Sequence, residues 1–91
     1  APRAKPKRAG RGVILARRAE LRKAEGRVEK LEERRGKLDE KLADPTLYAT
    51  DRVADLAVCQ RKHAEVLDGI ARAEALWENA QARLDEAEGS A

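Results

Sequence analysis

The residues best suited to chemistry in this 91-residue chain are its one cysteine and one histidine, Cys59 and His63. A spacing of four places both on one helix face, where such a pair could act as nucleophile and base or bind a metal. A closed zinc site needs four ligands, and no further ligand stands at metal spacing beside the pair. The many carboxylates fall on solvated helix faces with no cavity between them. We therefore expect no catalytic residue, no metal site and no cofactor, and interpret both residues as part of a helix seam.

The second set of reactive side chains is basic and gathers toward the N-terminus. Residues 1–27 hold ten Lys and Arg against two acidic residues, a net charge of +8, whereas residues 28–91 have a net charge of −5. Clustered cations release counterions from nucleic acid and bind its phosphates with little regard to sequence. The residues predicted to make these contacts are Lys5, Lys7, Arg8, Arg11, Arg17, Arg18, Arg22, Lys23 and Arg27. The alternative is that these cations serve solubility and pair within the molecule. An antiparallel hairpin would place residues 65–91, which are rich in Asp and Glu, beside this basic start.

The elements that must position these side chains are helices. The chain is 42% hydrophobic and 41% charged, with no Phe or Met, which is too little bulk for a globular core but enough for a seam between two helices. Apolar residues recur in steps of three and four, as in a helix with one buried stripe. The rows are Ile14, Leu21, Val28, Arg35 and Leu42 with Arg17, Ala24, Leu31 and Leu38, then Leu56, His63, Ile70, Trp77 and Leu84 with Cys59, Val66, Ala73, Ala80 and Ala87. The pattern predicts an all-α fold, two long helices in an antiparallel intramolecular coiled-coil hairpin with a short turn at its tip.

Helix-breaking residues set the predicted boundaries. Residues 1–12, which are rich in Pro, Gly and basic side chains, are predicted to be a flexible basic arm, and residues 13–88 the hairpin. Within the hairpin we expect helices over 13–43 and 51–88, with the tip at 44–50.

The tip sequence carries its own signals. Pro45 disfavours helical geometry at Asp44, which can cap a new short turn with Pro45 in its first position. Leu47 is expected to seal the end of the hairpin, and Thr50 or Asp51 can cap the second helix.

Two registers one heptad apart fit the rows. One places Leu38 beside Leu56 and needs the shorter turn. The other places Leu38 beside His63 and Ala24 beside Trp77, which pairs large side chains with small ones. We favour the first register slightly because of its shorter turn.

The tip and the late tryptophan also carry a family resemblance. The residues concerned are Glu20-Leu21, Arg27-Val28-Glu29, Leu31-Glu32, Leu38, Leu42-Ala43-Asp44-Pro45, Leu47-Tyr48 and Trp77. Over about residues 20–84 the chain resembles the C-terminal domain of Uup-type ABC-F ATPases. Arg35 stands where that family usually has an aliphatic residue, and Gly-Arg-Gly-Val-Ile-Leu replaces the usual Lys-Leu-Ser-Tyr-like entry to the first helix.

The resemblance implies a coiled-coil hairpin that binds nucleic acid, either DNA or ribosomal RNA, with the ATPase chemistry in separate domains of the parent chain. No P-loop motif occurs in this sequence. We thus expect a monomeric nucleic-acid-binding hairpin that is not an enzyme, with Tyr48 at the tip and the parent ATPase domains or another protein as further contacts. The alternative is a structural or protein-interaction module, in which the Ala-rich row of the second helix admits another helix or mediates self-association.

The remaining features concern location and completeness. One cysteine allows no internal disulfide, and no apolar run approaches the roughly 20 residues of a membrane span. We therefore expect a cytoplasmic location. Because the sequence contains no methionine, we also expect it to be part of a longer gene product.

Overall fold

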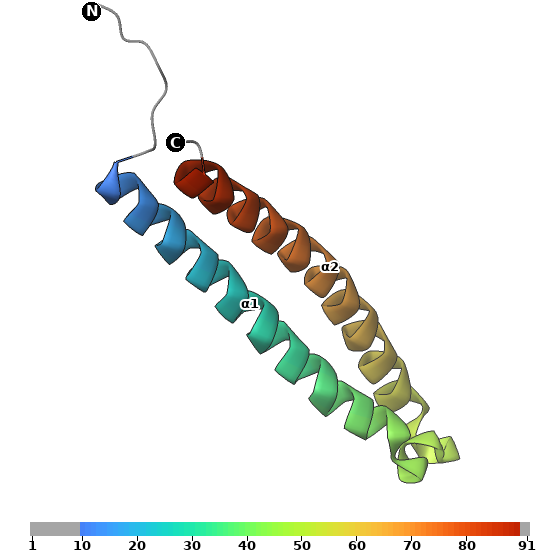
Figure 1. The fold of residues 1–91 in the computed structure, drawn as a ribbon. Helices are drawn as coiled ribbons and strands as arrows, with labels where there is room; N and C mark the ends of the chain where they lie inside the picture. Colours follow the sequence, from blue (N-terminus) through green and yellow to red (C-terminus); the bar gives the residue numbers. More distant parts are fainter. Residues whose placement is uncertain (1–9, 90–91) are drawn as a thin grey trace, which may run out of the picture.

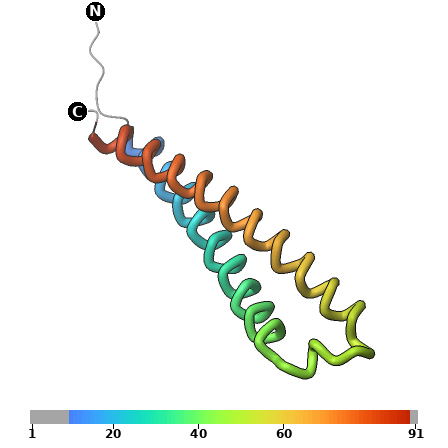
Figure 2. The backbone as a smooth tube through the Cα atoms, turned by 90° about the vertical axis from the view of Figure 1, so that its right-hand side faces the viewer, coloured from blue at the N-terminus to red at the C-terminus, as the bar shows by residue number. Residues whose placement is uncertain are grey.

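Two long antiparallel helices joined by two short 3₁₀ turns make up the computed structural model, which describes residues 10–89 (Figure 1). The helices are α1 (Arg11–Ala43) and α2 (Val53–Gly89), and the turns between them are η1 (Pro45–Tyr48) and η2 (Thr50–Arg52). In both views α1 and α2 run side by side, and the start of α1 lies next to the end of α2 (Figure 2). The predicted all-α hairpin is confirmed.

The helix pairing buries the stripe that the heptad rows predicted. All nineteen residues of those rows are buried or half-buried, whereas nearly all the residues between them are exposed. The buried members are Leu38 in α1 and Cys59, Val66, Ile70, Ala73, Leu84 and Ala87 in α2. A seam this narrow leaves most row positions partly open to solvent, which is why a polar residue such as Arg35 is tolerated there.

The observed register is the second of the two, so the preference for the shorter turn was wrong. His63 Nε2 lies 2.7 Å from Asp39 Oδ1, and a Cβ placed on Gly69 would lie 3.7 Å from Leu31 Cδ2. These contacts pair the large side chain of Leu31 with a glycine, as complementary packing requires. The longer connection, residues 44–52, gives Leu47 enough chain to fold back and cover the end of the seam.

The start of α1 differs from the prediction. The helix begins at Arg11, so Arg11 and Gly12 belong to its first turn rather than to a linker. The first N–H groups of a helix lack intrahelical partners in any case, so a glycine in the first turn lowers the stability of the helix only slightly. Gly10 is the N-cap residue, and its carbonyl accepts the backbone N–H of Ile14 at 3.1 Å. The remainder of the predicted arm, residues 1–9, lies outside the described residues.

The start of α2 also differs. Thr50 and Asp51 lie in η2 and neither caps α2, which begins at Val53. The backbone N–H of Arg52 donates to the Ala49 carbonyl at 2.9 Å, closing a second tight turn. The chain therefore enters α2 through this turn. A backbone carbonyl, and not the expected side chain of Thr50 or Asp51, accepts a hydrogen bond from a backbone N–H just before the helix.

The tip itself is organised by side chains, as predicted for Asp44, Pro45 and Leu47. Asp44 Oδ1 accepts the backbone N–H and the hydroxyl of Thr46, each at 2.9 Å, and Pro45 occupies the first turn of η1. These hydrogen bonds hold the pKa of the Asp44 carboxyl below its usual value of 3.8. Leu47 is only 6% exposed and closes the seam.

Candidate nucleic-acid interface

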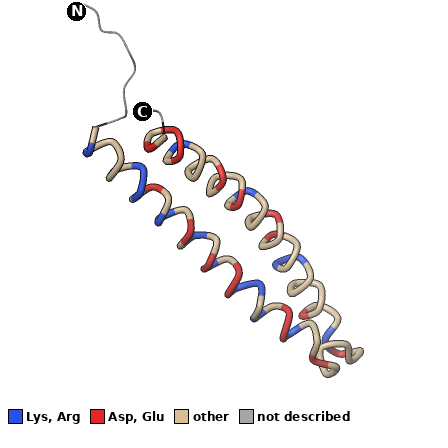
Figure 3. Tube along the Cα trace, viewed as in Figure 1, with Lys and Arg blue, Asp and Glu red and all other residues tan. Residues whose placement is uncertain are grey.

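The basic residues predicted from the sequence do not form one patch. Lys5, Lys7 and Arg8 lie outside the described residues. The other six predicted residues belong to α1. Residues three and four apart share one side of a helix, and by this spacing the six lie on the seam and on two opposite flanks. Arg17 lies on the seam, Arg11, Arg18 and Arg22 lie on one flank, and Lys23 and Arg27 lie on the other. Figure 3 shows Lys and Arg distributed along α1 toward the tip rather than confined to its start.

Ion pairs occupy part of the basic start of α1. Arg17 Nη1 lies 3.0 Å from Glu20 Oε1, and Arg18 Nη2 lies 2.8 Å from Glu88 Oε2 on α2. Glu20 also approaches Arg83 Nη1 at 3.8 Å. The hydrogen bond from Arg17 and the charges of Arg83 and Arg17 lower the pKa of the Glu20 carboxyl below its usual value. The cross-hairpin pairing considered as an alternative is therefore present at Arg18, whereas Arg17 pairs within α1.

An uninterrupted basic row lies farther along α1. Its six residues follow one another in steps of four and three, and all are exposed. This row, here called the basic flank, consists of Lys23, Arg27, Lys30, Arg34, Lys37 and Lys41. At about 1.5 Å per residue it extends for about 27 Å along one side of the helix. All the ion pairs found within residues 10–89 use other basic side chains, so these six cations are unpaired there.

The basic flank borders the groove between the helices, to which α2 adds charge. A cleft of about 420 Å³ is lined by Arg34, Lys37 and Lys41 from α1 and by Lys62 from α2, with Glu65 as its only acidic residue. Nearer the chain ends, a cleft of about 340 Å³ is lined by basic side chains of both helices, Lys23, Arg27 and Arg83, together with Glu20. Cations from both helices therefore point into the same groove.

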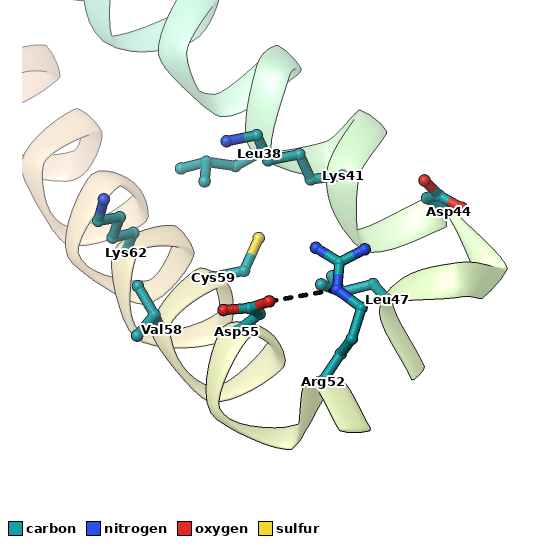
Figure 4. A pocket seen from close by; sticks show the side chains of 9 residues that line it. All are labelled: Leu38, Lys41, Asp44, Leu47, Arg52, Asp55, Val58, Cys59 and Lys62. Atoms are coloured by element: carbon teal, nitrogen blue, oxygen red, sulfur yellow. Dashed lines mark hydrogen bonds and ion pairs between the residues drawn. The ribbon is translucent and has the colours of Figure 1, made fainter. Parts of the chain in front are cut away.

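A third cleft, of about 390 Å³, extends this groove to the tip (Figure 4). Lys41 and Lys62 recur in its lining, and Arg52 lies opposite them, paired with Asp55 at 3.2 Å. Cys59 lines its floor and is only 6% exposed, which leaves little of the thiol accessible for chemistry.

The other side of the hairpin has the opposite charge. Two cross-helix ion pairs identify the sides: Glu20 with Arg83 on the side of the basic flank, and Arg18 with Glu88 on the other. The row of Glu88 on α2 and the facing row on α1 are rich in carboxylates. These residues, here called the acidic flank, are Glu25, Glu29, Glu32 and Asp39 of α1 and Glu74, Glu78, Asp85 and Glu88 of α2. The two sides of the hairpin thus present potentials of opposite sign.

Four residues of the basic flank were missed in the sequence: Lys30, Arg34, Lys37 and Lys41. Net charge concealed them, because residues 28–91 carry more acids than bases, and that count averages over opposite faces of the helices. The available signal was the spacing itself. Between residues 23 and 41, every position on this side of the helix is Lys or Arg.

The remaining residues of interest have structural partners. His63 is a half-buried seam residue that bonds Asp39 across the hairpin and not Cys59. Arg35 extends from the seam to Glu32 and Asp39, at 3.2 and 3.9 Å. In the part of the chain that the structure describes, no three His, Cys, Asp or Glu side chains are grouped to hold a metal ion.

The two aromatic side chains have different surroundings. Trp77 is half-buried on the seam, as its row predicted, and its Nε1 is buried without a hydrogen-bond partner. Tyr48 is 53% exposed at the tip, and its hydroxyl donates to the Leu42 carbonyl at 2.7 Å. That bond satisfies one of the last carbonyls of α1, which have no partner within the helix. Tyr48 therefore both closes the tip and presents part of its ring to solvent.

Comparison with known proteins is consistent with this arrangement. Residues 15–82 match the family described as the ABC transporter C-terminal domain. No curated protein matches the chain, nor does any solved structure. Within residues 10–89, neither helix is long and apolar enough to cross a membrane. Since the match covers most of the sequence, the chain belongs to the ABC transporter C-terminal domain family, the coiled-coil domain found in ABC-F ATPases such as Uup.

Proposed function

We propose that the hairpin is a nucleic-acid-binding arm of an ABC-F type protein, and that it holds phosphates along its basic flank. The observation that carries this proposal is the row of six exposed cations without ion-pair partners within residues 10–89. Acidic residues such as Glu33 and Glu40 lie at helical spacing from this row, but none of them pairs with its cations within residues 10–89. A row of cations without ion-pair partners maintains a positive potential able to attract a polyanion.

The predicted contact residues take different roles in this proposal. Lys23 and Arg27 belong to the binding face, joined by Lys30, Arg34, Lys37, Lys41 and, across the groove, Lys62. Arg17 and Arg18 are engaged with Glu20 and Glu88, and Arg11 and Arg22 lie on the side of the acidic flank. The charges of Lys5, Lys7 and Arg8 add to the attraction.

The ligand is proposed to be DNA or ribosomal RNA, because both present the same phosphate chemistry. A protein that neutralises Z phosphates of duplex DNA loses affinity with salt at a slope of about −0.9Z on logarithmic axes. Engagement of all six residues of the basic flank would therefore lower affinity by a factor on the order of 10³ between 50 and 200 mM salt. Contacts of the hairpin with the ATPase domains of its parent chain, and of Tyr48 with a partner, stay predictions.

The test compares two triple variants of equal charge by fluorescence anisotropy over a range of salt concentrations. Lys30→Gln, Arg34→Gln and Lys37→Gln remove cations from the basic flank. Arg11→Gln, Arg22→Gln and Arg61→Gln, the matched control, remove exposed cations elsewhere that are likewise unpaired within residues 10–89. We expect the first variant to weaken binding and to reduce the salt slope by about 0.9 for each lost contact. The control should retain nearly the full slope.

Two outcomes would contradict the proposal. If the unmodified chain fails to bind nucleic acid at low salt, the hairpin is not such an arm. If both triple variants weaken binding equally, net charge and not the basic flank is responsible.

The alternative function, a protein-interaction module, loses the surface on which it was based. The Ala-rich row expected to admit another helix, Cys59, Val66, Ala73, Ala80 and Ala87, faces α1 and is buried or half-buried. A helix from another protein or another copy therefore cannot pack against this row unless the hairpin opens.

A further inference from the structure

We infer that the nucleic acid held by the basic flank is a double helix and not a single strand, and that the flank contacts the phosphate backbones on the outside of this double helix. This inference rests on the proposed function and specifies its ligand. The first observation is the absence of aromatic side chains from the binding face. Proteins that bind single strands without sequence preference rely on aromatic side chains, on which bases stack for about 1–3 kcal/mol each.

The chain has only two aromatic residues, and neither lies on the basic flank. Trp77 belongs to the seam row of α2 and is half-buried. Tyr48 lies at the tip, and its hydroxyl is committed to the Leu42 carbonyl. A single strand on this face would find cations for its phosphates but no platform for its bases, which favours a ligand whose bases are already stacked and paired.

The second observation is the geometry of the row. Six cations in steps of four and three are spaced by about 5 Å along a row of about 27 Å. A duplex carries one charge per roughly 1.7 Å of its axis, against one per roughly 3.4 Å for each strand. The ligand that lies along the row therefore has about twice the linear charge density when it is double-stranded. A duplex is also stiff over about 150 base pairs, so it loses little freedom on lying against a rigid helix, whereas a flexible strand must be ordered.

The third observation is the width of the arm. Two helices side by side, each about 10–12 Å across with side chains, are wider than the roughly 12 Å major groove. Five residues of the basic flank, all except Lys30, line clefts that side chains of α2 also line, so α1 cannot enter the groove alone. Its Lys and Arg side chains therefore reach phosphates and not base edges, which predicts little dependence on base sequence. The acidic flank repels a second duplex, so each arm should bind one.

The experiment uses the 91-residue chain and three labelled probes: a duplex of mixed sequence, one of its strands alone, and a duplex of unrelated sequence and equal length. Anisotropy at low salt should give the two duplexes similar affinities. The affinity of the single strand should be lower than theirs by a factor of about ten or more. The salt slope should be about 0.9 per contact for the duplexes and about 0.7 for the strand. The basic-flank triple variant should bring duplex and single-strand affinities closer together.

The outcomes separate this inference from the proposed function. A single strand that binds as tightly as the duplex, or more tightly, overturns the inference and leaves the nucleic-acid-binding function standing. Strong preference between the two duplexes contradicts backbone recognition. If none of the probes binds, the proposed function fails and the inference fails with it.

Discussion

The two halves of the hairpin have the same architecture but different interiors. In the half near the tip, Leu38, Leu47, Cys59, Val66 and Ile70 form one buried cluster, with Leu31, Leu42 and Leu56 packed against it. In the half near the chain ends, the seam rows contain Arg17, Ala24, Trp77 and Ala80, and cross-helix ion pairs join Arg18 to Glu88 and Glu20 to Arg83. Heptad spacing is therefore enough to pair the helices, but the size of the row residues decides where the pairing is strongest.

The difference follows from the ends of the seam. At the tip, a third segment closes the seam, because η1 places Leu47 over it at 6% exposure. No described segment covers the seam at the opposite end, where α1 begins and α2 ends side by side. A cluster covered on three sides excludes water better than a two-sided seam, so we expect the tip half to supply most of the stability.

The largest expected effect tests this comparison directly. Leu38→Ala should lower the free energy of unfolding by about 2–5 kcal/mol, because it leaves a cavity inside the tip cluster. Leu84→Ala, the matched change in the other half, removes an equally buried side chain outside that cluster and should lower it less. Urea unfolding followed by circular dichroism measures both. Equal losses would show that the two halves contribute equally.

Most of the fold could be predicted from the sequence because helix pairing depends on a local pattern. The nineteen row positions are readable from spacing alone, and so were the roles of Asp44 and Leu47 at the tip. The register could not be chosen by turn length, because it depends on how Leu31 fits against Gly69 and on how much chain Leu47 needs to reach the seam. These are contacts between residues far apart in the sequence.

The candidate site was less predictable. Charge was counted along the chain, whereas a ligand meets charge on a face, so Lys30, Arg34, Lys37 and Lys41 were overlooked. Arg18 was assigned to the site although its partner Glu88, 70 residues away, becomes adjacent only in the hairpin. The Asp39–His63 contact was missed for the same reason.

A gain of stability should come from filling a gap in the tip half. Gly69 lies inside α2, and a methyl group there would meet Leu31 at ordinary contact distances of 3.7 and 3.8 Å. Gly69→Ala should therefore raise the free energy of unfolding by about 1 kcal/mol, since alanine favours the helix over glycine by that amount. Gly26→Ala, in the other half, should give the helix-propensity gain without a contact, because nothing lies within 4 Å of its added methyl group. A smaller gain at Gly69 than at Gly26 would indicate that Leu31 must move.

A smaller, pH-dependent effect should arise at the tip cap. The pKa of Asp44 is lowered by its hydrogen bonds from Thr46, so its charged form stabilises the folded state above its unfolded pKa. That contribution disappears as the pH falls through the folded-state value, below about pH 4. Asp44→Ala should thus lower the midpoint of thermal unfolding near neutral pH, and its difference from the unmodified chain should narrow in acid. Asp51→Ala, which removes an exposed carboxylate without a hydrogen bond in the described structure, should show no such narrowing.

The smallest expected effect concerns the ion pair at the open end. Arg18 and Glu88 are 52% and 38% exposed, so water and salt screen their attraction, and such pairs contribute about 0–1 kcal/mol. A double-mutant cycle with Arg18→Gln and Glu88→Gln should therefore give a coupling energy within that range, decreasing as salt is added. A coupling well above it would mean that charge, not the burial of Leu84 and Ala87, joins the helices there. The end half would then be stabilised electrostatically, and a high concentration of sulfate, which strengthens apolar burial at the tip while screening charge, should loosen the chain ends selectively.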